Sequence, residues 1–253
     1  MITLKILLTN DDGIRGTGLW AIANMLKTRG HEVTIAAPFN QQSGMSHALS
    51  LQREIEYKRF DNPDFEAWTF DGTPTDCVKI YLEGMNPGKF DALISGINDG
   101  ANLATDVIYS GTVGGALEGF LHAIPSLAVS RDKNSTIPFD MAASATVDYL
   151  EKLLSVKSEP FFHNLNFPKN FHAGKAEFVS TRLGQRDYLN AFTSHTDDKG
   201  RAYFKIGGTI VDLDDGEGTD IYAVNRGFIS VTPLHSDVSD YDSMVELRKI
   251  FRG

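Results

Sequence analysis

The chain of 253 residues contains only one cysteine, Cys77. A single thiol excludes an internal disulfide and a metal site built from several cysteines. No apolar run approaches the roughly 18 residues that a membrane-spanning helix needs, and the first residues lack the pattern of a signal peptide. The sequence therefore predicts a protein of the reducing cytoplasm that has no membrane partner.

Positive charge is also scarce, because 24 Lys and Arg residues stand against 33 Asp and Glu residues, for a formal net charge of −9. General nucleic-acid binders neutralise phosphates with Lys and Arg, so we expect no nucleic-acid partner. A small anionic substrate would need local help from a metal ion or a helix N-terminus. The phosphate-loop signature and the Gly-x-Gly-x-x-Gly fingerprint are both missing, which argues against a cofactor-dependent dehydrogenase.

Short apolar runs alternate with helical patterns through the first half of the chain. Residues 2–9 and 31–38 are typical of buried parallel strands, and residues 19–26 between them predict a helix that ends at Gly30. Further strands are expected at 90–95, 124–130, 161–168 and 229–233, and further helices at 78–85 (capped by Thr75 or Asp76), 113–123, 142–154 and 243–251. This order predicts an α/β protein with a doubly wound, mainly parallel sheet.

Two β-hairpins are expected beside this alternation. The first lies within residues 49–70 and turns at 61–64, and the second lies within 176–210 and turns at 197–200. The change from strand–helix alternation to hairpins suggests a boundary near residue 135. Residues 1–135 would form the catalytic core, and residues 136–253 would supply the rest of the core with the hairpin and C-terminal elements.

Small oxygen-bearing side chains follow several predicted strands or precede a helix. These segments are 10–13, 42–46, 96–102 and 110–112. Carboxylates of Asp11 and Asp12, the amide of Asn98 and the hydroxyl of Ser43 are ligands that Mg²⁺ or Mn²⁺ accepts. Adjacent strand residues point to opposite faces, so both acids reach one ion only if the chain turns at Gly13. The other interpretation of this run is a plain polar turn.

The run Ser110-Gly111-Thr112 stands where a helix is expected to begin. Free backbone N–H groups and the helix dipole favour phosphate at such a terminus, and the hydroxyls add donors. The alternative is that Ser110 or Thr112 is simply the N-cap of the helix.

Taken in chain order, these segments resemble the SurE family, the survival-protein phosphatases that act as metal-dependent nucleotidases. The matching runs are TNDDG (9–13), SGMS (43–46), GTPTDC (72–77), SGINDGAN (95–102) and DVIYSGTVGGALEG (106–119), with a weaker match of TD (219–220) and SVTPLHSD (230–237). The chain departs from the family pattern after Asp237. The pattern often has His four residues later, where this chain has Tyr241, so a role that depends on that His is in doubt.

The resemblance implies a three-layer Rossmann-like α/β fold, with hairpin extensions and a smaller C-terminal region exchanged between subunits of a homodimer or homotetramer. It also implies one divalent ion per subunit, Mg²⁺ or Mn²⁺. The ligands would be Asp11, Asp12, Ser43 and Asn98, and the phosphate group would lie near Asn102, Ser110, Gly111 and Thr112. Implied substrates are nucleoside 5′-monophosphates, with 3′-monophosphates and polyphosphate as further possibilities.

The expected reaction is hydrolysis of a phosphomonoester by a metal-activated water, with Asp11 or Asp12 as general acid or base. An aspartyl-phosphate intermediate is a less favoured route. The alternative function is a non-catalytic sensor that binds a nucleotide or phosphometabolite in the same crevice. Clustered carboxylates would repel such an anion unless a metal intervened, so metal-dependent phosphate release distinguishes the enzyme from the sensor.

Overall fold

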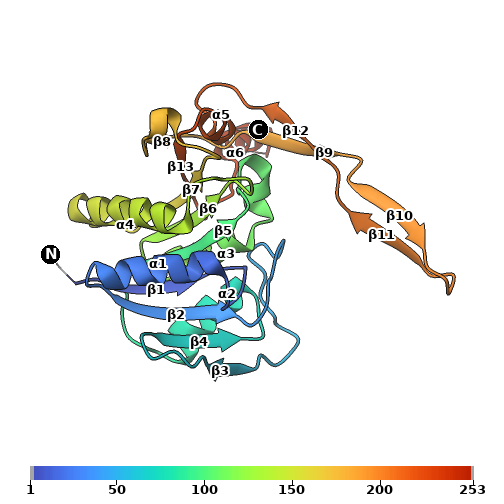
Figure 1. Ribbon diagram of the computed structural model, residues 1–253. Coiled ribbons are helices and arrows are strands. Elements are labelled where there is room, and N and C mark those ends of the chain that lie inside the picture. The colour runs from blue at the N-terminus through green and yellow to red at the C-terminus, as the bar shows by residue number, and fades with distance from the viewer. Residues whose placement is uncertain (1–2, 252–253) are drawn as a thin grey trace.

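The computed structural model describes residues 3–251 and contains, in that range, one large sheet of nine strands. Their order across the sheet is β3-β4-β2-β1-β5-β6-β7-β13-β8 (Figure 1). The bounds are β1 Lys5–Thr9, β2 Glu32–Pro38, β3 Tyr57–Arg59, β4 Glu66–Phe70, β5 Ala92–Asp99, β6 Ser126–Arg131, β7 Phe162–Phe167, β8 Phe178–Ser180 and β13 Ile229–Pro233. Strands from β4 to β7 pair in parallel, whereas β3 and β13 are antiparallel to β4 and β7. The mainly parallel sheet is therefore confirmed.

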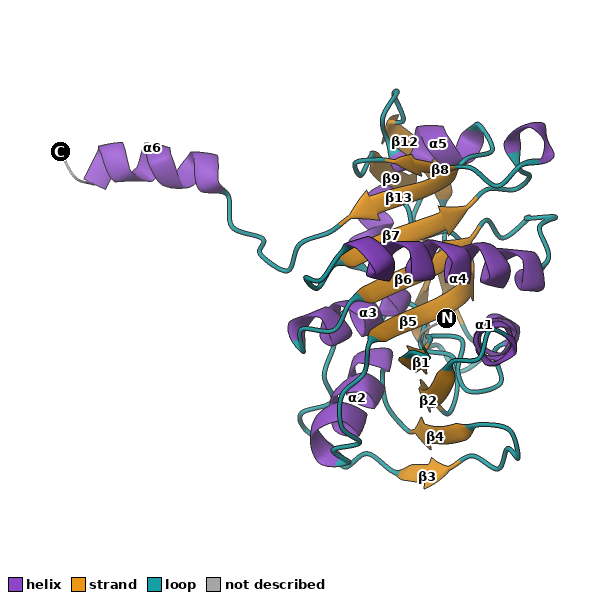
Figure 2. Cartoon of the chain, turned by 90° about the vertical axis from the view of Figure 1, so that its left-hand side faces the viewer, coloured by secondary structure: helices purple, strands orange, loops and turns teal. Residues whose placement is uncertain are grey.

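Helices cover both faces of this sheet (Figure 2). Helices α1 (Thr17–Thr28) and α4 (Phe139–Val156) pack in one core cluster with Ile6 and Leu8 of β1. Helices α2 (Pro74–Lys79, continued by a π-helical turn at Ile80–Gly84) and α3 (Gly111–Leu121) pack in a second cluster with Leu7. Successive strand residues point to opposite faces, so the uninterrupted apolar run of β1 produces the predicted three-layer α/β architecture.

The strand order reverses at β1. Strands β2 and β4 lie on one side of β1, and β5, β6 and β7 lie on the other. Open α/β sheets bind ligands at such a switch point, in the crevice beyond the carboxyl ends of the strands. In this sheet that position is the edge between the ends of β1 at Thr9 and β5 at Asp99, where two of the polar segments emerge.

Both expected hairpins are present. Strands β3 and β4 form the first, although its strand begins only at Tyr57 rather than near 49. The second is one long projection, which we call the arm (residues 185–214; Figure 1). Its root pairs β9 (Gln185–Leu189) with β12 (Thr209–Asp214), and its tip pairs β10 (Phe192–Thr196) with β11 (Ala202–Ile206).

The chain closes with α5 (Asp220–Asn225) and α6 (Tyr241–Phe251). Figure 2 shows α6 at the end of an extended segment, away from the sheet. Two short 3-10 turns lie at Ala104–Ile108 and His172–Gly174. Within residues 3–251, every helix is too short or too polar to span a lipid bilayer.

The expected N-cap of α2 was wrong. Thr73 is the cap, not Thr75 or Asp76, because Pro74 occupies the first helical position and Asp76 the third. The Thr73 hydroxyl accepts a hydrogen bond from the Asp76 N–H, and the Asp76 carboxylate accepts one from the Thr73 N–H. This reciprocal pair is a capping box.

Candidate metal and phosphate site

Asp11 stands where three segments meet, just beyond the end of β1. Its side chain is buried, and the Thr112 hydroxyl at the start of α3 donates to its Oδ1 at 2.6 Å. Its backbone oxygen accepts a hydrogen bond of 2.7 Å from the N–H of Gln42, in the loop after β2. The carboxyl end of β1 is thus fixed against both neighbouring polar segments.

Asp12 turns toward the other neighbour of β1. Burial raises the pKa of its carboxyl group, while the backbone of Asp99, at the end of β5, lies close enough to lower it. Gln41 Nε2 lies 3.4 Å from Asp12 Oδ1, on the side of the loop after β2. The turn that both acids require occurs at Gly13, whose φ of +88° is a conformation that favours glycine.

The two carboxylates lack a balancing positive charge. Burial raises the pKa of Asp11 to about 6, with a smaller contribution from the negative charge of Asp12. Burial also raises the pKa of Asp12, and the charge of Asp99 adds to this. No cationic side chain of residues 3–251 contributes to either shift. A buried and a half-buried acid in this state are suited to a divalent cation with oxygen ligands.

Ser43 and Asn98 reach the same edge of the sheet from either side of β1. Ser43 is exposed on the loop after β2, and Asn98 is half-buried near the end of β5. Asn98 Nδ2 donates to the Gly100 oxygen at 2.7 Å, which leaves Oδ1 to accept. Neither side chain is hydrogen-bonded to Asp11 or Asp12 in the described part of the chain, so the assignment of all four side chains to one ion stays a prediction.

The start of α3 lies directly against Asp11. A Cβ on Gly111 would lie 3.0 Å from the Asp11 Cβ, a tight contact that would push against Asp11. Thr112 donates its hydroxyl to Asp11, and this hydrogen bond and the nearby Thr112 backbone both favour the charged carboxylate. Ser110 is the N-cap, since its hydroxyl accepts from the Val113 N–H at 3.1 Å. The capping interpretation is confirmed, and it is compatible with an anion on the remaining donors.

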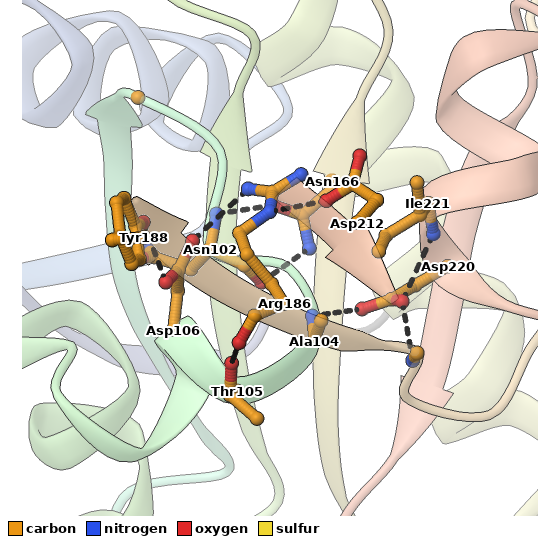
Figure 3. A network of polar contacts seen from close by, with 12 residues as sticks. Asn102, Ala104, Thr105, Asp106, Asn166, Arg186, Tyr188, Asp212, Asp220 and Ile221 are labelled. Carbon is orange, nitrogen blue, oxygen red and sulfur yellow. Dashed lines mark hydrogen bonds and ion pairs between the residues drawn. The ribbon is translucent and has the colours of Figure 1, made fainter. Parts of the chain in front are cut away.

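Asn102 is held by the sheet rather than by the start of α3. Its Nδ2 donates to Ser130 Oγ at 2.7 Å, and its N–H donates to Asn166 Oδ1 at 2.8 Å (Figure 3). Its backbone oxygen accepts from the side chains of Asn164 and Asn166. Within residues 3–251 it makes no hydrogen bond to residues 110–112. Asn164 and Asn166 were not predicted from the sequence, although two amides alternating within a short strand were a usable signal.

A second group of potential metal ligands lies elsewhere. Carboxylate and imidazole atoms of Glu83, Glu118 and His122 lie within 4.8 Å of one another. The Lys79 ammonium, however, lies 2.7 Å from Glu83 and 3.2 Å from Glu118, and His47 binds Glu118 at 2.7 Å. This group already contains its own cations, so it is an ion-pair cluster and not the candidate metal centre.

Comparison with known proteins shows the family to which the chain belongs. A family model described as "Survival protein SurE" matches residues 6–190. The "5'-nucleotidase SurE" of Pelotomaculum thermopropionicum is 37% identical over 252 residues, which cover 98% of this chain and 96% of the relative. The protein of the same description from Heliobacterium modesticaldum is 40% identical over 247 residues, covering 96% and 90%.

A solved structure is similar over the same extent. The crystal structure of the SurE protein from Aquifex aeolicus superimposes with a TM-score of 0.81 at 35% sequence identity. The match covers 97% of this chain and 99% of that chain, so it includes the arm and the C-terminal elements as well as the sheet.

Proposed function

This chain belongs to the SurE family, and from that membership we infer that it is a divalent-metal-dependent 5′-nucleotidase that hydrolyses nucleoside monophosphates. The observation that carries this proposal is the pair of adjacent carboxylates at the switch point of the sheet, the buried Asp11 and the half-buried Asp12, to which no cationic side chain of residues 3–251 is paired. A sensor that only binds an anion has no need of such a pair, because the charges oppose binding.

We assign the metal to Asp11, Asp12, Ser43 and Asn98. This set offers only oxygen ligands from β1 and its two neighbours, which suits Mg²⁺ or Mn²⁺ and one ion per subunit. When bound, the ion would polarise the phosphoryl group and lower the pKa of water. Thr112 fixes the orientation of the Asp11 carboxylate through its hydroxyl. Asp12 accepts no hydroxyl hydrogen bond from residues 3–251, so we assign it the proton transfer.

The substrate phosphate is proposed to lie at the start of α3. Gly111 brings the backbone close to Asp11, and the Ser110 hydroxyl and Gly111 N–H are the donors that Asp11 does not use. The positive end of the helix dipole points at this position. Asn102, which we also propose as a phosphate contact, retains a second amide hydrogen beyond the one given to Ser130.

A second copy of the chain is the other proposed partner, in a homodimer or homotetramer. Every residue of α6 and of the arm tip β10–β11 is exposed, including Phe204, Ile206, Ile250 and Phe251. Exposed apolar segments of this kind mark protein–protein contacts. Tyr241, which replaces the histidine of the family pattern, donates to the Asp237 carboxylate at the start of this region.

The first test is phosphate release from nucleoside 5′- and 3′-monophosphates and short polyphosphate, with EDTA, Mg²⁺ or Mn²⁺. We expect metal-dependent release that is fastest with 5′-monophosphates. Asp11→Asn should lower kcat by about a hundredfold or more, the scale of losing a group that acts on the transition state. Asp64→Asn is the matched control, because this exposed acid pairs with Lys27 on the surface.

The alternative sensor has a distinct outcome. Folded protein that binds a nucleoside monophosphate by calorimetry in Mn²⁺ but releases no phosphate from any substrate would contradict the enzyme. Equal activity of Asp11→Asn and Asp64→Asn at saturating metal would instead contradict the assignment of Asp11.

A further inference from the structure

The segment 102–109 connects β5 to the start of α3, and the structure holds it from several sides. Asn102 is bound to the sheet, as described above. The Ala104 N–H donates to Asp220 Oδ2 at 2.8 Å, and Asp220 is completely buried at the start of α5. Ala104 has a φ of +53°, which is uncommon for a residue with a side chain. The conformation of this segment therefore depends on contacts with other parts of the chain.

The root of the arm supplies another set of these contacts (Figure 3). Arg186 Nη1 donates to Asp106 Oδ2 at 3.0 Å, and Tyr188 Oη donates to Asp106 Oδ1 at 2.7 Å. The backbone oxygen of Arg186 accepts from the Thr105 hydroxyl at 2.6 Å. Both oxygens of Asp106 are thus bound by neighbouring residues of β9, only four positions before Ser110.

Arg186 is itself fixed within the arm. Its Nε donates to Asp212 Oδ1 at 2.7 Å, and Asp212 lies opposite Arg186 in the pairing of β9 with β12. The Arg186 side chain is only 10% exposed. Burial opposes its charge, but the two carboxylates outweigh this and keep its pKa raised. The planar, always charged guanidinium of Arg186 therefore joins Asp212 of the arm to Asp106. A lysine ammonium does not reproduce this planar arrangement of donors.

We propose that Arg186 is a positioning residue for the phosphate site, which sets the place of Ser110 and Gly111 by holding Asp106 against the root of the arm. This inference rests on the proposed function, and it assigns the arm root an indirect part in binding phosphate, through Asp106. The metal ligands lie on β1, the loop after β2 and β5, and none of them contacts Arg186. Loss of Arg186 should consequently weaken phosphate binding more than metal binding.

The test compares Arg186→Met and Arg186→Lys with the unaltered full chain. Affinity for inorganic phosphate is measured by calorimetry on Mn²⁺-loaded protein and as competitive inhibition, and Mn²⁺ affinity is measured separately. Arg186→Met should weaken phosphate binding and raise KM about tenfold, as expected for losing one charge-assisted contact. Arg186→Lys should recover only part of this, and Mn²⁺ affinity should change less than about twofold in both, since no metal ligand is touched.

The arm provides a matched control. Arg201 pairs with Asp197 at the tip of the arm, whereas Asp106 contacts only the root. Arg201→Met should therefore leave phosphate affinity unchanged. Tyr188→Phe removes one hydroxyl from Asp106 and should give a smaller rise of KM, which keeps the test usable if Arg186→Met fails to fold.

Several outcomes would overturn the inference. One is an unchanged phosphate affinity in Arg186→Met. Another is an equal loss of phosphate and Mn²⁺ affinity in proportion to a lower thermal unfolding midpoint, which would indicate general destabilisation. If Arg186→Met does not fold, an unchanged KM of Tyr188→Phe would overturn the inference instead. Calorimetry with phosphate needs no turnover, so absence of nucleotidase activity would contradict the proposed function and still leave this measurement decisive.

Discussion

Gly18 shows how one residue brings α1 onto the sheet next to the candidate site. An ideal Cβ at this position would lie 2.0 Å from the backbone oxygen of Ile97, the residue before the proposed ligand Asn98. The helix therefore approaches β5 so closely that no side chain fits between them. The place of Asn98 depends on this contact.

We expect Gly18→Ala to destabilise the protein although alanine favours helix. Overpacking against backbone costs about 1–3 kcal/mol, more than the gain of about 1 kcal/mol in helix propensity. Urea unfolding should show the loss, and Mn²⁺ affinity should fall because Asn98 shifts. Asn24→Ala, at an exposed position of the same helix, is the control. A Gly18→Ala protein as stable as Asn24→Ala would disprove the close approach.

His163 on β7 should make the stability of the protein depend on pH. It is buried, stacks on Phe161 and shares a 2.8 Å hydrogen bond with the Tyr149 hydroxyl. Burial, with a smaller effect of Lys157, lowers its pKa to about 4. In the unfolded chain the pKa is about 6.5, so between these values the unfolded state binds more protons.

Stability should therefore fall as the pH drops from about 6.5 toward 4, by up to about 3 kcal/mol from this residue. His163→Gln should flatten that part of the curve of unfolding free energy against pH. His195→Gln on the exposed arm tip should retain the wild-type slope. Identical slopes for both variants would show that His163 does not titrate in this window.

At the scale of elements, the capping box of α2 anchors a neighbouring loop as well as the helix. Thr73 donates to the Ala48 oxygen at 2.7 Å. The Asp76 carboxylate accepts from both the N–H and the hydroxyl of Ser50. A local cap thus fastens the chain that follows the proposed metal loop.

Thr73→Ala should lower the unfolding free energy by about 1–2 kcal/mol, since it removes a helix cap and a loop contact. Thr73→Ser keeps the hydroxyl and should lose much less. Urea denaturation of the two variants measures the difference. A serine variant as unstable as the alanine variant would mean that packing of the threonine methyl group, and not the hydroxyl, stabilises this junction.

At the scale of the whole molecule, α6 has an apolar face but no contact that buries it. Leu247 is 50% exposed and Ile250 is 69% exposed. A helix of eleven residues is only marginally stable alone in water. A second copy of the chain that covers this face would explain why the helix forms.

Removal of residues 238–253 should therefore reduce the assembly to a smaller species, as measured by light scattering after size exclusion. Ile250→Asp should have the same effect, because it places a charge in the covered face. Arg248→Ser on the same helix should leave the mass unchanged. A full-length chain that is monomeric at micromolar concentration would contradict the proposed assembly.

The sequence by itself determined the fold class and the edge of the sheet where chemistry gathers. The periodicity of hydrophobic residues is a local signal, and so is the position of polar residues at strand ends. Strands such as 31–38 and the turn at Gly13 could therefore be predicted from the sequence. The assignment of Asp11 and Asp12 to a metal came from two carboxylates at a strand end and from the family motifs, and it stays a prediction. The N-cap of α2 was misplaced because a cap depends on geometry at one residue, which a helical pattern does not fix.

Only the tertiary structure decided the contacts between distant segments. Arg186 meets Asp106 across 80 positions of sequence, and Ala104 meets Asp220 across 116. Periodicity carries no information about such pairs, because each depends on how the arm and α5 return to the sheet. The burial that raises the pKa of Asp11 has the same origin, since it results from α3 and the loop after β2 closing over the end of β1.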